Sequence, residues 1–226
     1  MKKRIQHIIK YESKVKSFVR GTFDEKRILK DSAKIHFRTG HNFPLKGLLF
    51  GVKDIINVDG YPTRCGSLLP HELFKGLQAS CVSKLLNAGA IFAGKTVTAE
   101  FAVSDPGETR NPRNLSHTPG GSSSGSGASV AAGFCDIAIG TQTSGSVIRP
   151  AGYCGVIGYK PSFGRISRDG VLLFSNSMDH VGICAKDLNL LEKILPIIVD
   201  GWRYQKPKIN RNISIGVPVG LSLIHI

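Results

Sequence analysis

Two glycine- and serine-rich stretches and one lysine in an apolar segment could together support nucleophilic catalysis. The stretches are residues 120–127 (GGSSSGSG) and residues 141–146 (TQTSGS), and Lys53 lies in the apolar run at residues 48–56. A serine hydroxyl is a weak nucleophile that needs a base to accept its proton. Burial disfavours the charged form of lysine and lowers the pKa of its amine, so a buried Lys53 could be that base.

Lys53 also has a structural interpretation. A lysine in an apolar strand can extend its ammonium to solvent or pair with a buried carboxylate. Asp54 follows directly, but successive side chains on a strand point to opposite faces, so we expect its carboxylate to lie away from the Lys53 amine. The residues by themselves leave the catalytic and the structural interpretations of Lys53 open.

Two other motif patterns lack the context that their mechanisms need. Residues 89–96 (GAIFAGKT) match the phosphate-binding pattern G-x-x-x-x-G-K-[ST], but a helix is expected before them and AIFA favours a buried strand. Residues 121–125 (GSSSG) match the nucleophile elbow G-x-S-x-G, with Ser123 as the nucleophile. That motif requires a strand upstream, where this chain has a turn-rich loop. An α/β-hydrolase-type esterase that uses Ser123 nevertheless stays an alternative.

Apolar periodicity and turn residues predict helices that alternate with strands, which indicates an α/β fold. Helices are expected at residues 5–19, 24–36, 78–88, 99–103, 128–132 and 187–197. Strands are expected at residues 48–56, 90–93, 136–140, 156–159 and 213–217. Both Gly/Ser stretches adjoin these elements, so we expect packed loops and not flexible linkers.

The composition excludes several classes of protein. Of the net charge of +14, residues 1–40 carry twelve basic and four acidic side chains, which favours a solvated basic helix over a nucleic-acid surface. No apolar run reaches the roughly 18 residues of a membrane span, and the N-terminus lacks the apolar core of a signal peptide. The five cysteines and seven histidines are scattered singly, which predicts no metal site and a reducing, cytoplasmic location.

Three segments together resemble the amidase signature hydrolases. Residues 44–54 (PLKGLLFGVKD) resemble the catalytic-lysine strand of that family, residues 120–126 (GGSSSGS) its serine-rich signature, and residues 140–150 (GTQTSGSVIRP) its nucleophile loop. Ser122 and Ser146 are 24 residues apart, which is the family's spacing. The resemblance extends from about residue 12 to residue 217.

The resemblance implies a catalytic role for each of three side chains. Ser146 would be the acylated nucleophile, Ser122 would follow a cis peptide bond and relay the proton, and Lys53 would be the terminal base. The oxyanion hole would consist of the backbone N–H groups of Thr143, Ser144, Gly145 and Ser146. The supporting loop would contain Gly121, Ser123 and Ser124. The implied fold is a mixed, largely parallel β-sheet covered by helices on both sides, with no metal or organic cofactor.

By this resemblance the chain would be a general amidase that cleaves a small carboxamide. An alternative within the family is a protein like the A subunit of glutamyl/aspartyl-tRNA amidotransferase. Such proteins usually carry Asp at the position of Gln142 and Gly at that of Ser144, so these two residues favour the general amidase. An allophanate- or urea-type substrate and a homo-oligomer both stay open.

Family domains are about twice as long as this chain, which predicts a copy shortened at its C-terminus. The expected division is an N-terminal helical segment at residues 1–40, a partial amidase signature domain at residues 41–220 and a non-native tail at residues 221–226. An inactive fragment is therefore a further alternative. Such a fragment would expose a strand edge and favour aggregation.

Overall fold

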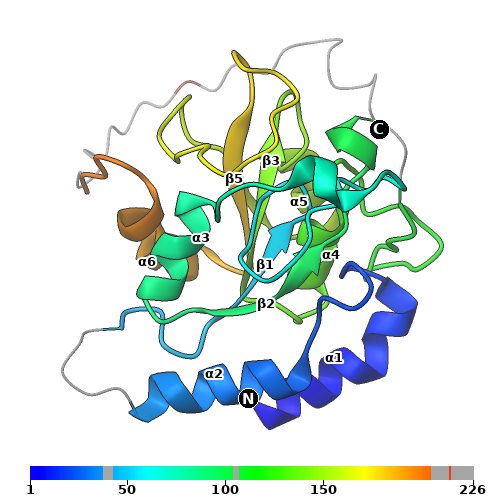
Figure 1. The fold of residues 1–226 in the computed structure, drawn as a ribbon, viewed down its shortest axis with the longest axis vertical. Helices are drawn as coiled ribbons and strands as arrows, with labels where there is room; N and C mark the ends of the chain where they lie inside the picture. The colour runs from blue at the N-terminus through cyan, green and yellow to red at the C-terminus, as the bar shows by residue number, and fades with distance from the viewer. Residues whose placement is uncertain (38–42, 104–106, 205–213, 215–226) are drawn as a thin grey trace.

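The computed structural model describes residues 1–37, 43–103, 107–204 and 214, and these form one sheet with helices packed around it (Figure 1). The helices are α1 (Lys2–Val15), α2 (Glu25–Phe37), α3 (Ser80–Asn87), α4 (Ser124–Ala131), α5 (Ile148–Cys154) and α6 (Leu188–Ile198). The strands are β1 (Leu49–Lys53), β2 (Ile91–Thr96), β3 (Ile137–Gln142), β4 (Ile157–Tyr159) and β5 (His180–Ala185). Two 3₁₀ turns, η1 (His71–Phe74) and η2 (Glu100–Ala102), lie between these elements.

The strands are arranged in the order β2-β1-β3-β5-β4. Strand β1 pairs in parallel with β2 and with β3. Strand β5 runs antiparallel to both of its neighbours, β3 and β4, so four of the five described strands point the same way. The sheet is therefore mixed and largely parallel, as the sequence analysis predicted.

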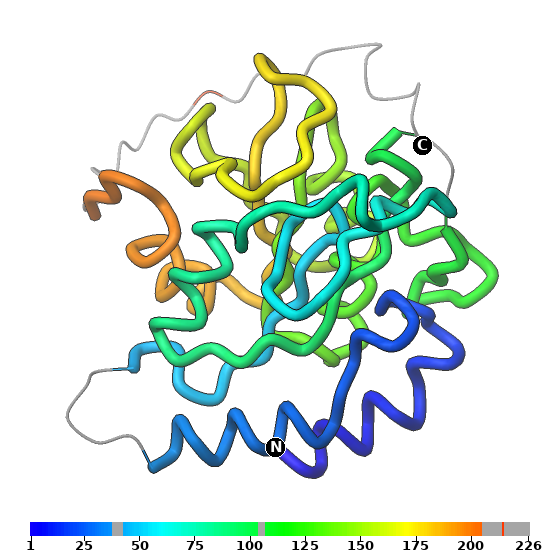
Figure 2. Tube along the Cα trace, viewed as in Figure 1, coloured from blue at the N-terminus to red at the C-terminus, as the bar shows by residue number. Residues whose placement is uncertain are grey.

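Helices cover both faces of the sheet (Figures 1 and 2). Phe50 and Val52 of β1 belong to an apolar cluster with residues of α3 and α6. Leu49 of the same strand belongs to a second cluster with residues of α1, α2, α4 and α5. Because both faces are covered, every residue of β1 is buried, which explains why its sequence reads as a continuous apolar run.

The serine-rich stretch is part of a helix whose small residues allow close packing. Helix α4 begins at Ser124, four residues earlier than the helix predicted at residues 128–132. A Cβ atom on Gly125 would lie 2.2 Å from the Ser17 carbonyl oxygen, and one on Gly127 would lie 2.9 Å from that of Pro150. The stretch is therefore packed, as predicted, because larger side chains would not fit there.

Other predicted elements need correction. Residues 99–103 form the short 3₁₀ turn η2 and not an α-helix, since Phe101 and Ala102 adopt positive φ angles of 46° and 62°. Helix α5 and strand β5 were not predicted. Strand β2 extends as far as Thr96, so the Gly-Lys-Thr of the phosphate-binding pattern belongs to the sheet. The strand predicted at residues 213–217 lies outside the described residues, apart from residue 214.

Candidate active site

Lys53 is the last residue of β1, and its side chain points into the α4 side of the sheet. The Lys53 Nζ atom lies 2.8 Å from Ser122 Oγ and 2.9 Å from Thr141 Oγ1. The side chain is completely buried, so its ammonium does not extend to solvent. The amine therefore meets two hydroxyl groups at hydrogen-bond distance, in a place that water does not reach.

Burial lowers the pKa of the Lys53 amine from its usual 10.5 to about 7, and the negative charge of Asp179 opposes this fall. The Asp54 carboxylate takes no part, because it pairs with Lys95 Nζ at 2.8 Å. The prediction that Asp54 points away from Lys53 is therefore confirmed. At neutral pH a substantial fraction of Lys53 is a neutral amine that can accept a proton.

Ser122 lies in the loop that leads into α4. The peptide bond between Gly121 and Ser122 is cis. The Ser122 carbonyl oxygen accepts a hydrogen bond from the Ala99 N–H at 3.0 Å, so the loop is attached to the segment that follows β2. Gly120 has a φ of 76°, and a Cβ atom there would lie 3.1 Å from the Tyr153 ring. This glycine is therefore required both by its backbone angle and by the close approach of α5.

Ser146 lies between β3 and α5, next to the loop that carries Ser122. Its carbonyl oxygen accepts a hydrogen bond from the Ser123 N–H at 3.2 Å. Among the described residues, none hydrogen-bonds to the Ser146 hydroxyl or to the backbone N–H groups of residues 143–146. This leaves one hydroxyl and several consecutive N–H donors free to meet a ligand at the end of β3.

The other residues assigned to the supporting loop have structural contacts. Ser123 is completely buried, and its hydroxyl donates to the Thr141 carbonyl oxygen at 3.1 Å. The Ser124 hydroxyl donates to the Val97 carbonyl oxygen at 3.3 Å. Gly121 has open space where a Cβ atom would be. The two serines thus attach the loop to the ends of β2 and β3.

Three residues to which the sequence assigned no positioning role hold this region together. Thr141 contacts the Lys53 amine, and Gln142 hydrogen-bonds to the loop at residues 143–148. Asp179 accepts a 2.5 Å hydrogen bond from the Thr143 hydroxyl. Thr141 and Gln142 lie inside the motif at residues 140–150 and could have been found there. Asp179 precedes β5, which was not predicted, and it carried no comparable signal.

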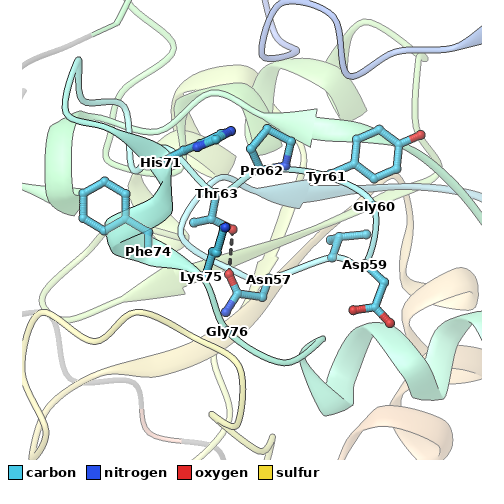
Figure 3. Close-up of a pocket in the computed structure, with 11 residues that line it drawn as sticks. Asn57, Asp59, Gly60, Tyr61, Pro62, Thr63, His71, Phe74, Lys75 and Gly76 are labelled. Atoms are coloured by element: carbon cyan, nitrogen blue, oxygen red, sulfur yellow. Dashed lines mark hydrogen bonds between the residues drawn. The ribbon is translucent and has the colours of Figure 1, made fainter.

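A separate cavity of about 400 Å³ lies between the loop at residues 57–63 and the segment at residues 71–76 (Figure 3). In that view the Thr63 hydroxyl faces Asn57, to whose Oδ1 atom it donates at 2.7 Å. The described residues that line this cavity do not include Lys53, Ser122 or Ser146.

Within the described residues, no group of three or more His, Cys, Asp or Glu side chains is arranged to hold a metal ion. The five cysteines are free and buried, and burial raises the pKa of all five thiols to about 12. Of the helices in the described part of the chain, none is long and apolar enough to span a bilayer.

Comparison with known proteins agrees with this architecture. The family model described as Amidase matches residues 1–218. The A subunit of glutamyl-tRNA(Gln) amidotransferase from Methanosarcina barkeri is 39% identical over 226 residues, which cover 92% of this chain and 47% of the relative. The protein of the same name from Salinibacter ruber is 43% identical over 165 residues, which cover 70% of this chain and 32% of the relative.

Solved structures share the fold as well. The crystal structure of a peptide amidase from Stenotrophomonas maltophilia matches with a TM-score of 0.78 at 33% identity, over 87% of this chain and 43% of that one. The fold and the sequence matches thus define one class of protein, and the chain belongs to the amidase family. It spans about half the length, or less, of the curated relatives that it matches.

Proposed function

We propose that this chain carries the catalytic groups of an amidohydrolase that cleaves a carboxamide C–N bond through an acyl-enzyme on Ser146. The observation that carries the proposal is the environment of the Lys53 amine. It is completely buried, it lies 2.8 Å from the Ser122 hydroxyl, and its pKa is lowered to about 7. A lysine in this state is suited to accept a proton from a serine.

The proposed reaction uses the side chains of Ser146, Ser122 and Lys53 in turn. The Ser146 Oγ atom attacks the carbonyl carbon of the amide and passes its proton to Ser122, whose own proton moves to the Lys53 amine. The resulting oxyanion is stabilised by the free backbone N–H groups of residues 143–146. The C–N bond then breaks, and Ser122 protonates the leaving amine and recovers a proton from Lys53. Water attacks the ester by the same route, which releases the acid and restores Ser146.

A second candidate function is that of an amidotransferase A subunit, in which the same chemistry releases ammonia from an amide. The observation in its favour is that the curated relatives described above carry that name, at 39% and 43% identity. Gln142 and Ser144 favour the general amidase. Hydrolysis of glutamine, compared with that of a simple aliphatic amide, would separate the two functions.

The test compares two serine variants of the full chain. A fluorophosphonate probe should label the wild-type chain, and Ser146→Ala should abolish both labelling and amide hydrolysis. Ser123→Ala should retain both, at a cost of about 1 kcal/mol in the free energy of unfolding, because the Ser123 hydroxyl makes a buried hydrogen bond. The reverse pattern would favour the esterase that uses Ser123. A folded wild-type chain that is neither labelled nor active would favour the inactive fragment.

A further inference from the structure

The side chain of Gln142 makes three hydrogen bonds to the nucleophile loop, which we define as residues 143–148. Gln142 is the last residue of β3 and is 5% exposed. Its Oε1 atom accepts from the Val147 N–H at 2.9 Å and from the Ile148 N–H at 3.0 Å. Its Nε2 atom donates to the Ser144 carbonyl oxygen at 2.9 Å. One planar amide therefore bridges both ends of the loop that contains Ser146.

The bond to Ser144 has a consequence for its neighbour. The Ser144 carbonyl group and the Gly145 N–H group belong to one planar peptide unit and, in a trans peptide, point in opposite directions. When the Gln142 amide holds the carbonyl oxygen on the inside of the loop, the Gly145 N–H is directed to the outside. Gly145 has no side chain to restrict its backbone, so this orientation depends on an external contact.

The two bonds to Oε1 act at the other end of the loop. Val147 precedes α5 and Ile148 begins it, and the first N–H groups of a helix have no partner within the helix. Their bonds to Gln142 fix the start of α5 relative to the end of β3. Ser146 lies between the two attachment points, so its position relative to Ser122 depends on both.

We propose that Gln142 is a positioning residue that orients the Gly145 N–H toward the developing oxyanion and holds Ser146 in place. The inference rests on the proposed function, since it assigns a role within the same site. The three hydrogen bonds of this side chain require an amide. A carboxylate at position 142 could accept from the N–H groups of Val147 and Ile148, but it could not donate to the Ser144 carbonyl oxygen. The competing interpretation is a helix cap that contributes to stability alone.

The experiment compares three variants of the full chain in two reactions. Hydrolysis of an amide gives kcat and KM, and phosphonylation of Ser146 by a fluorophosphonate gives a labelling rate. In the labelling step the Ser146 Oγ–P bond forms, fluoride leaves with the P–F electron pair, and the serine proton passes through Ser122 to Lys53. Gln142→Leu removes all three hydrogen bonds, and Gln142→Glu retains the two acceptor bonds.

Gln78→Leu is the matched control. The Gln78 amide accepts from the Asp59 N–H at 3.2 Å and donates to Ser83 Oγ at 2.9 Å, away from Ser146. This variant therefore also loses the hydrogen bonds of one glutamine side chain, but at a distance from the nucleophile loop. It should lose thermal stability and keep the wild-type rate.

Gln142→Leu should lower the labelling rate and kcat about 10²-fold, the usual effect of losing one oxyanion donor, with little change in KM. At pH 8 the labelling rate and kcat of Gln142→Glu should lie between those of the wild-type chain and those of Gln142→Leu. Its rate relative to wild type should recover as the pH is lowered, because the new carboxyl group gains a proton that it can donate to the Ser144 carbonyl oxygen.

Each outcome decides the question. If folded Gln142→Leu and Gln142→Glu both react at the wild-type rate, Gln142 is a cap and the inference is wrong. If Gln142→Leu does not fold, Gln142→Glu decides, and a rate ratio to wild type that does not depend on pH contradicts the inference. A wild-type chain that does not react, or a Ser146→Ala variant that still does, overturns the proposed function and this inference with it. If the wild-type chain reacts and the Gln142 variants react equally fast, the inference is wrong and the proposed function stands.

Discussion

Two neighbouring strands each bury a lysine completely, and the two lysines have different partners. Lys53 ends β1 and contacts the hydroxyl groups of Ser122 and Thr141. Lys95, in β2, lies 2.8 Å from a carboxylate oxygen of Asp54 and 3.0 Å from the Thr63 hydroxyl. Both side chains are 0% exposed, so burial does not distinguish them.

The register of the sheet places the two lysines on opposite faces. Lys95 is paired with Val52, whose side chain belongs to the cluster under α3 and α6. Lys53 is paired with Thr96, whose hydroxyl hydrogen-bonds to Ser126 of α4 at 2.8 Å. Side chains of paired residues share a face, so Lys95 meets Asp54 while Lys53 meets the serine loops.

The difference in partners separates a candidate base from a structural ion pair. Burial lowers the pKa of Lys95 and raises that of Asp54, and each charge opposes the shift of the other. This pair can stay ionised as a structural link. Lys53 has no carboxylate in contact among the described residues, so burial lowers its pKa to about 7 and makes it a candidate base.

The largest effect is expected from Lys53→Met, which tests the catalytic half of the comparison. Removing a general base lowers rates by about 10²–10⁴-fold, and we expect kcat to fall by an amount near the upper end of that range. The thermal midpoint should stay the same or rise, because the variant no longer buries an amine without a charged partner. Circular dichroism melting, measured beside kcat, checks both expectations. A large loss of stability would mean that Lys53 is structural like Lys95.

Lys95→Met tests the structural half, with the next largest effect. It leaves the Asp54 carboxylate buried without its counter-charge, which should lower the free energy of unfolding by about 3–5 kcal/mol. Urea denaturation measures this loss. The double variant with Asp54→Asn should recover part of it, because the unpaired charge is gone. If the double variant were no more stable than Lys95→Met, the two side chains would not interact across the core.

A smaller effect concerns pH and tests the cause of the lowered Lys53 pKa. Activity should rise as the pH increases through about 7, since the proposed base is the neutral amine, which forms above its pKa. Asp179 favours the ammonium form, so Asp179→Asn should lower the Lys53 pKa further and move the rise in kcat/KM to lower pH. If activity rose only near pH 10.4, the pKa of a free lysine, burial would not be lowering the Lys53 pKa. A shift to higher pH in Asp179→Asn would contradict the role of its charge.

Much of the fold followed from local sequence. The apolar run around Lys53 predicted β1, and the alternation of helices and strands predicted the layers. Helix α5 could not be predicted in the same way. It is short, it contains Pro150, and it is held by the side chain of Gln142 in addition to its own backbone. Strand β5 contains Gly182 and depends on pairing with β3 and β4 on both sides.

The candidate site shows the same division. The three motif segments, their order and the 24-residue interval between Ser122 and Ser146 were visible in the sequence. The contacts of Lys53 with Ser122 and with Thr141 join residues that are 69 and 88 positions apart. No local pattern specifies such contacts, since they arise when the sheet brings the ends of β1 and β3 together.

The sequence by itself determined that Lys53 lies in an apolar strand, and the order of the motifs associated that strand with two serine-rich loops. The tertiary structure covers both faces of the sheet and so leaves this lysine no route to water. The tertiary structure decided which of two buried lysines meets a carboxylate and which meets hydroxyl groups. The physical reason is that a buried ammonium is stabilised or neutralised by the groups within a few ångströms of it, and strand register and helix packing choose those groups.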